Sequence, residues 1–166
     1  MASGAFFDPL VALRALPLVS STCTLLFGWD QTFFLGIMNR PENRAKSKPL
    51  LQSYFNTFFY RGLPFVVGAI AVSTWSGVGN LFAQRSVLQS RQSFWWYTAG
   101  TIAAASHLLF VPLIAPSVKD MMDGKGKTDA NDCLDEWLRV NNVRTLTVDL
   151  LAWGAFMVAA GKTLCH

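Results

Sequence analysis

Three titratable side chains interrupt the apolar stretches of this sequence: Asp30, His107 and Asp149. A titratable group inside a membrane-spanning helix is costly, so it usually points into the bundle and serves a function. A histidine there can accept a proton near neutral pH, and a neighbouring carboxylate can orient its ring and stabilise the imidazolium. The residue types therefore indicate an acid–base site, with His107 as the base and Asp30 or Asp149 as its partner.

Four stretches are long and apolar enough to position these side chains within a bilayer, since a spanning helix needs about 20 residues. They cover about residues 16–35, 59–82, 94–114 and 143–164. All four are rich in Gly, Ala, Ser and Thr, which let helices approach one another closely in lipid. Backbone polar groups must be satisfied internally in a membrane, so we predict an all-α fold. We expect residues 1–166 to form one domain, an integral membrane four-helix bundle.

The connections between the spans set the expected orientation. Residues 115–142 are expected to form a polar loop that contains a short helix from about Asp129 to Val140, capped by Asp129 or Asn131. Ten of the 14 Lys and Arg residues are Arg144 or lie in one of two connections, this loop and the first connection over residues 36–61. The positive-inside rule then predicts that both connections face the cytosol and both termini face away from it.

That orientation places the three titratable groups at one depth. With a rise of about 1.5 Å per residue, each lies roughly 5–7 Å from the midpoint of its span, on the cytosolic side. One interpretation is a polar pocket inside the bundle, and the other is a hydrogen-bond network that only holds helices together. Asp30 could instead cap its helix or meet Arg40, and Asp149 could pair with Arg144.

The arginines near the cytosolic ends of the spans and the tryptophans within the spans also have two interpretations. Arg61 and Arg144 either extend to the lipid headgroups or attract an anionic or phenolate substrate. The tryptophans either pack in the core or form walls for a flat aromatic ligand. The tryptophans within the spans are Trp29, Trp75 and Trp153.

Composition excludes several classes of protein. Of the 166 residues, 52% are apolar and 14% are charged, against about 25% charged in an average soluble domain. These values argue against a disordered chain, a nucleic-acid arm and an ordinary cytosolic enzyme. The net charge of +4 and the pI of about 9.2 are attributed to topology and headgroup contacts, not to nucleic acid.

No pattern in the sequence indicates a bound metal or cofactor. Cys23, Cys133 and Cys165 have neither disulfide-framework nor zinc-ligand spacing. Nucleotide-binding glycine motifs are absent, and two histidines do not make a haem or di-iron site. We therefore expect any redox chemistry to proceed without a bound metal or cofactor.

The second half of the chain resembles the anthrone oxygenase family, a group of small four-span proteins common in fungi. The resemblance covers roughly residues 95–160. It rests on an apolar span that ends in a proline-containing turn (HLLFVPLIAPSVKDM from His107), a variable loop, and a W-x-x-x-N-x-V-R pattern before the last span. In this sequence the pattern reads Trp137, Asn141 or Asn142, Val143 and Arg144.

The resemblance implies oxidation of an anthrone-like polyketide to a quinone with O2, in secondary metabolism. His107 would be the base, Arg144 with Asn142 would bind the developing oxyanion, and Trp29 and Trp153 would contact the substrate. The expected partners are the lipid bilayer, a small aromatic substrate and O2, and the chain could form oligomers.

The alternative is a non-catalytic four-span accessory subunit of a larger membrane complex. We expect a multi-pass protein of the endoplasmic reticulum, with the inner mitochondrial membrane as the other candidate.

Overall fold

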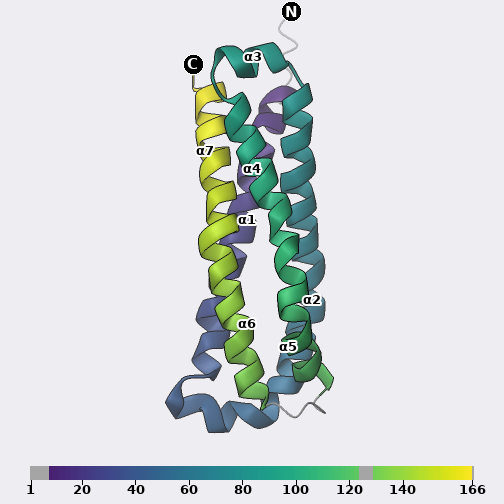
Figure 1. Cartoon of the computed structure of the whole chain (residues 1–166), viewed down its shortest axis with the longest axis vertical. Helices are drawn as coiled ribbons and strands as arrows, with labels where there is room; N and C mark the ends of the chain where they lie inside the picture. The colour runs from purple at the N-terminus through teal and green to yellow at the C-terminus, as the bar shows by residue number, and fades with distance from the viewer. Residues whose placement is uncertain (1–7, 124–128, 166) are drawn as a thin grey trace, which may run out of the picture.

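Four helical rods, side by side, make up this computed structural model, which describes residues 8–123 and 129–165 (Figure 1). The first two rods are single helices, α1 (Pro9–Met38) and α2 (Pro41–Phe82). Each of the other two contains a short irregular turn. The third comprises α4 (Phe94–Ser106), η1 (His107–Phe110) and α5 (Val111–Asp123), and the fourth α6 (Ala130–Arg144), η2 (Thr145–Asp149) and α7 (Leu150–Leu164). The short α3 (Arg85–Ser90) joins the second rod to the third.

The predicted all-α membrane bundle is confirmed. All four rods are long and apolar enough to cross a membrane, and no strand occurs in the ranges given above. The start of α1 and the end of α7 lie at one end of the bundle, and the α1–α2 corner and the start of α6 lie at the other (Figure 1). The chain is thus a multi-pass membrane protein.

The predicted boundaries of the first connection were wrong. Residues 36–61 were expected to be a loop, but only Asn39 and Arg40 separate the two helices. Pro41 in the first turn of α2 and Glu42 just after it favour an early helix start. The added turns bury Leu51 and Phe55 against Trp137. A hydropathy window misses this segment because only one face of it is apolar.

The described residues of the expected loop over 115–142 are also mostly helical, and residues 124–128 of that loop lie outside the part of the chain that the structure describes. The third rod continues to Asp123, and α6 begins at Ala130 and runs without a break into the last span. The carboxylate of Asp129 accepts a hydrogen bond from the backbone N–H of Asn131 at 2.9 Å, so the predicted cap is present. An ion pair with Lys48 on α2 lowers the pKa of Asp129.

Ionic and hydrogen-bonded contacts hold each end of the bundle together. At the α6 end, Arg44 of α2 donates to Asp135 at 2.7 Å. At the opposite end the guanidinium of Arg14 is almost fully buried and donates to the side chain of Asn80 at 2.9 Å and to the carbonyl of Ala83 at 2.8 Å. A cation at the carboxyl end of α2 satisfies carbonyls that have no partner within the helix.

Close packing between the rods depends on glycine at two positions. A Cβ at Gly100 of α4 would lie 2.7 Å from the ring of Phe156, which is fully buried on α7. A Cβ at Gly77 of α2 would lie 2.2 Å from the hydroxyl of Thr101. These glycines let α2, α4 and α7 approach as closely as small residues allow in lipid.

We predict that Gly100→Ala lowers the unfolding free energy by about 1–3 kcal/mol, because Phe156 is held on all sides and cannot move away. Gly154→Ala on α7 is the matched control, since no atom lies within 4 Å of its added Cβ. Unfolding in mixed detergent micelles, followed by far-UV circular dichroism, measures both. Equal stability of the two variants would contradict the packing described here.

Candidate functional site

His107 lies at the point where the third rod loses its regular helical form. Pro112 cannot donate a backbone hydrogen bond, and its ring clashes with the carbonyl four residues earlier, at Leu108. The chain responds with a 3-10 turn over His107–Phe110 before α5 begins. The side chain of His107 points to the bundle interior there and is 5% exposed. The proline that ends α4 therefore also positions the histidine.

Asp149 lies at the second irregular turn, a π-helical turn over Thr145–Asp149. The backbone N–H of Leu150 bonds to the carbonyl of Thr145, five residues earlier. In an α-helix, residues five apart lie about 140° apart around the axis, whereas a π turn brings them nearly to one face. Arg144 and Asp149 can consequently meet, and π turns of this kind are frequent at functional sites.

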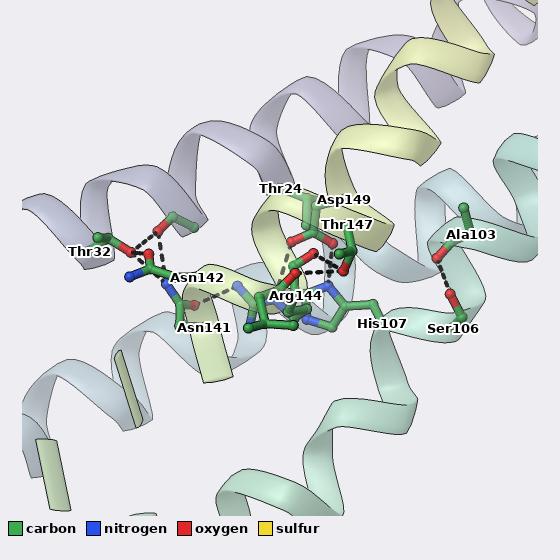
Figure 2. A network of polar contacts seen from close by, with 12 residues as sticks. Thr24, Thr32, Ala103, Ser106, His107, Asn141, Asn142, Arg144, Thr147 and Asp149 are labelled. Carbon is green, nitrogen blue, oxygen red and sulfur yellow. Dashed lines mark hydrogen bonds and ion pairs between the residues drawn. The ribbon is translucent and has the colours of Figure 1, made fainter. Parts of the chain in front are cut away.

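One carboxylate joins the two irregular turns (Figure 2). An oxygen of Asp149 lies 2.8 Å from Nδ1 of His107, and its other oxygen accepts from Nε of Arg144 at 3.1 Å. All three side chains are buried, at 4%, 5% and 8% exposed for Asp149, His107 and Arg144. Arg144 balances the charge of the carboxylate, as a charge buried in a membrane protein requires.

The network continues from Arg144 to α1. Nη2 of Arg144 donates to the side-chain oxygen of Asn141 at 2.7 Å, and the amide of Asn141 donates to the carbonyl of Gly28 at 3.0 Å (Figure 2). A Cβ at Gly28 would lie 2.6 Å from the hydroxyl of Thr145 and 3.2 Å from Nη2 of Arg144. Only glycine lets α1 approach this closely, so α1 helps to fix the guanidinium.

An apolar groove lies beside His107. Its walls come from α1, α2, α6 and the third rod, and they include Phe58, Phe59 and Trp137. The polar side chains among its lining residues are Gln31, His107, Trp137 and Arg144. Such a mainly apolar hollow with a few convergent polar groups is typical of a small-molecule site.

A second, much smaller space, with room for about one water molecule, lies on the Asp149 side of the histidine. Hydroxyl-bearing side chains line part of it: Ser21, Thr24 and Ser73. His107 lines both hollows, so its ring stands between a small partly polar space and a large apolar one. Nδ1 is bonded to Asp149, and Nε2 has no hydrogen-bond partner in the described part of the chain.

The structure brings some of the predicted site residues together and separates others. Asp30 is exposed and lines an outer hollow between α1 and α2, so it does not join His107 and Asp149. Asn142 accepts from Thr32 at 2.6 Å, and its neighbour Asn141 contacts Arg144 instead. Trp29 is 63% exposed on the outer surface.

Trp153 likewise does not line the groove. Its indole N–H donates to the hydroxyl of Thr22 at 3.1 Å, on the α1 face of α7. The aromatic wall is formed instead by Trp137, the first residue of the W-x-x-x-N-x-V-R pattern. Trp137, Asn141 and Arg144 are spaced four and three residues apart, which places them on one face of α6.

Gln31 is a groove residue that sequence reasoning missed. The buried face of α1 includes Ser21, Thr24, Gly28, Gln31 and Leu35, at alternating steps of three and four residues. This period places Gln31 inside and its neighbour Asp30 about 100° away around the helix. The regular spacing of small and polar residues on α1 was the signal that could have shown Gln31 to be buried and Asp30 to be exposed.

The fold and the site define a four-span membrane protein with a buried histidine–aspartate–arginine group beside an apolar groove. The chain is 30% identical over 148 residues to the epoxidase gkaX of Penicillium citrinum, which is 89% of this chain and 92% of that protein. It is 29% identical over 156 residues to the epoxidase pydX of an Acremonium species, 94% of this chain and 96% of that protein. It is 27% identical over 149 residues to the oxaleimides biosynthesis cluster protein N of Penicillium oxalicum.

These similarities extend along nearly the whole chain. The chain belongs to the family of small fungal epoxidases that includes gkaX. It is therefore an oxygenase-like enzyme of secondary metabolism. No family model and no solved structure matches the sequence.

We predict that Arg144→Met lowers the unfolding free energy by about 3–5 kcal/mol, because it leaves the Asp149 carboxylate buried without its cation. The double variant with Asp149→Leu should recover most of this loss, since apolar side chains can replace a buried ion pair. Denaturation in mixed micelles measures both. Arg139→Met is the matched control on α6, because Arg139 pairs with Glu136 on an exposed face and should cost less than about 1 kcal/mol. A similar cost for the two single variants would contradict a buried ion pair at Arg144.

Proposed function

We propose that this chain is a membrane-embedded oxygenase that oxidises an apolar, polyketide-type substrate held in the groove beside His107. One observation carries the proposal. His107 is fixed at Nδ1 by Asp149 and lines an apolar groove. A base oriented by a carboxylate, next to a slot for an apolar molecule, is the arrangement that proton transfer to or from such a substrate needs.

His107 would act through Nε2. Arg144 donates to one oxygen of the Asp149 carboxylate, and the other oxygen would accept a hydrogen bond from Nδ1–H of the imidazole. The lone pair of Nε2 is then available as a base. When the ring takes up a proton, the carboxylate stabilises the imidazolium. His107 is the proposed catalytic residue, and Asp149 and Arg144 orient it.

Epoxidation of a carbon–carbon double bond is the first candidate reaction, and the names of the relatives support it. One atom of O2 bridges the two carbons and the other leaves as water. Besides O2, this reaction consumes two electrons and two protons, so a reductant of the nicotinamide or flavin class must supply the electrons. His107 would deliver a proton to the oxygen atom that leaves.

Oxidation of an anthrone-like ring is the second candidate, supported by the aromatic walls of the groove and by the W-x-x-x-N-x-V-R pattern. His107 would remove a proton from the acidic methylene carbon, and Arg144 lines the groove where an oxyanion would form. The methylene becomes a carbonyl with one atom of O2, and the other atom leaves as water. The substrate supplies all the electrons, so this reaction needs no reductant.

We predict that His107→Ala lowers the turnover of membranes containing the protein by about 10²- to 10⁴-fold, the usual contribution of a general base. Asp149→Asn should lower it at least about tenfold, because the ring loses its orienting carboxylate. The assay supplies ¹⁸O2 with a linear conjugated triene alcohol or with anthrone, and mass spectrometry counts the labelled oxygen in the product.

Asp120→Asn on the exposed surface of α5 is the matched control and should retain wild-type turnover. Membranes without the protein correct for the spontaneous oxidation of anthrone in air. Dependence on added NADPH separates epoxidation from anthrone oxidation. Full activity of His107→Ala would remove His107 from the mechanism, and no labelled product from any wild-type assay would favour the accessory-subunit alternative.

A further inference from the structure

Gln31 places a buried amide in the wall of the apolar groove. Its side chain is 7% exposed, and its Oε1 atom is buried with no hydrogen-bond partner among the residues described. It lines the same groove as His107. A buried polar atom is costly unless it is hydrogen-bonded, and more so where lipid replaces water. A buried carbonyl oxygen without a partner, on a side chain that lines a hollow, points to a ligand that supplies the partner.

The other polar groups in the groove wall do not serve this amide. Arg144 donates through Nε to Asp149 and through Nη2 to Asn141, and His107 is bonded through Nδ1 to Asp149. Gln31 takes part in none of these contacts. In the groove wall, Gln31 on α1 and the indole of Trp137 on α6 are thus separate from the hydrogen-bonded group of His107, Asp149 and Arg144.

Gln31 also lines a second hollow, on the outer side of the groove. Gln31 and Phe58 line both the groove and this outer hollow between α1 and α2. Phe27 and Tyr54 complete part of the outer hollow, where Asp30 is exposed. The amide of Gln31 is thus next to both spaces and within reach of a ligand in either one.

The distance between Gln31 and His107 is fixed by the hydrogen-bond network that joins α1 to the third and fourth rods. Three residues before Gln31, the carbonyl of Gly28 accepts from Asn141, which in turn binds Arg144. Arg144 and His107 share the carboxylate of Asp149. Because one chain of bonds positions both sides of the groove, the site selects for a fixed distance between the anchored group and the reacting group.

We propose that Gln31 is a substrate-positioning residue that accepts a hydrogen bond from a hydroxyl or N–H group of an otherwise apolar substrate. This inference deepens the proposed oxygenase function and rests on it for the reaction, although the binding contact itself does not require turnover. It names the substrate class: a neutral, mainly hydrocarbon molecule with one hydrogen-bond donor set apart from the carbons that are oxidised.

Binding of two matched probes to purified protein in lipid nanodiscs tests this contact. The probes are 2-naphthol and 2-methoxynaphthalene, which share a ring system and differ in the donor hydrogen. We expect Gln31→Leu to weaken the binding of 2-naphthol about tenfold and to change that of 2-methoxynaphthalene less than twofold. The ratio of variant to wild-type Kd for each probe cancels its partition into the lipid.

Three further variants make the result decisive. Gln31→Met, which keeps the length of the side chain, should repeat the effect of Gln31→Leu if either variant folds poorly. Gln89→Leu, the same substitution on the exposed surface of α3, should leave both Kd values unchanged. His107→Phe should retain the preference for 2-naphthol, since the donor is bound at Gln31. Equal effects of Gln31→Leu on the two probes, or loss of the preference in His107→Phe alone, would overturn the proposal.

The binding experiment tests the contact at Gln31, and the turnover experiment tests the oxygenase function, so either claim can be contradicted without the other. Loss of the naphthol preference in Gln31→Leu supports the anchor even if no labelled product forms. Labelled product without any preference at Gln31 overturns the anchor and leaves the oxygenase function standing.

Discussion

The carboxylate of Asp149 is the group on which the site depends, because it is a negative charge inside a bundle surrounded by lipid. A buried carboxylate needs cationic or hydrogen-bond-donating groups around it, and the chain supplies them from two directions, Arg144 on one oxygen and His107 on the other. This requirement fixes the relative positions of the third and fourth rods. It also explains why α1 carries glycine at position 28, where a larger residue would displace the guanidinium.

Departures from regular helix build the site. Pro112 ends the hydrogen-bond ladder of the third rod just after His107, and the π turn in the fourth rod moves Asp149 onto the face of Arg144. Regular helices would keep the bundle intact but would separate the three side chains around their axes. The same irregular segment of the third rod lines the groove, so the deviation that positions the base also shapes the space for the substrate.

Hydropathy was sufficient to predict the fold class and the four rods, because the cost of exposing backbone polar groups to lipid leaves few folds other than a helical bundle. It was not sufficient for the length of α2, whose first turns are stabilised by one apolar face against α6. His107, Asp149 and Arg144 could be singled out as polar residues in apolar surroundings, whereas their contact depends on a π turn that no spacing rule indicates. Asp30 was predicted as a site residue because it is charged, whereas the buried face of α1 carries the uncharged Gln31.

The polar contacts at the two ends of the bundle govern how the molecule can change shape. Arg14 joins α1 to the end of α2, and Arg44 joins α2 to α6 at the opposite end. These contacts resist the separation of α1 from α2 at one end of the bundle and of α2 from α6 at the other, so the three helices of the groove wall that they join are held together at their ends.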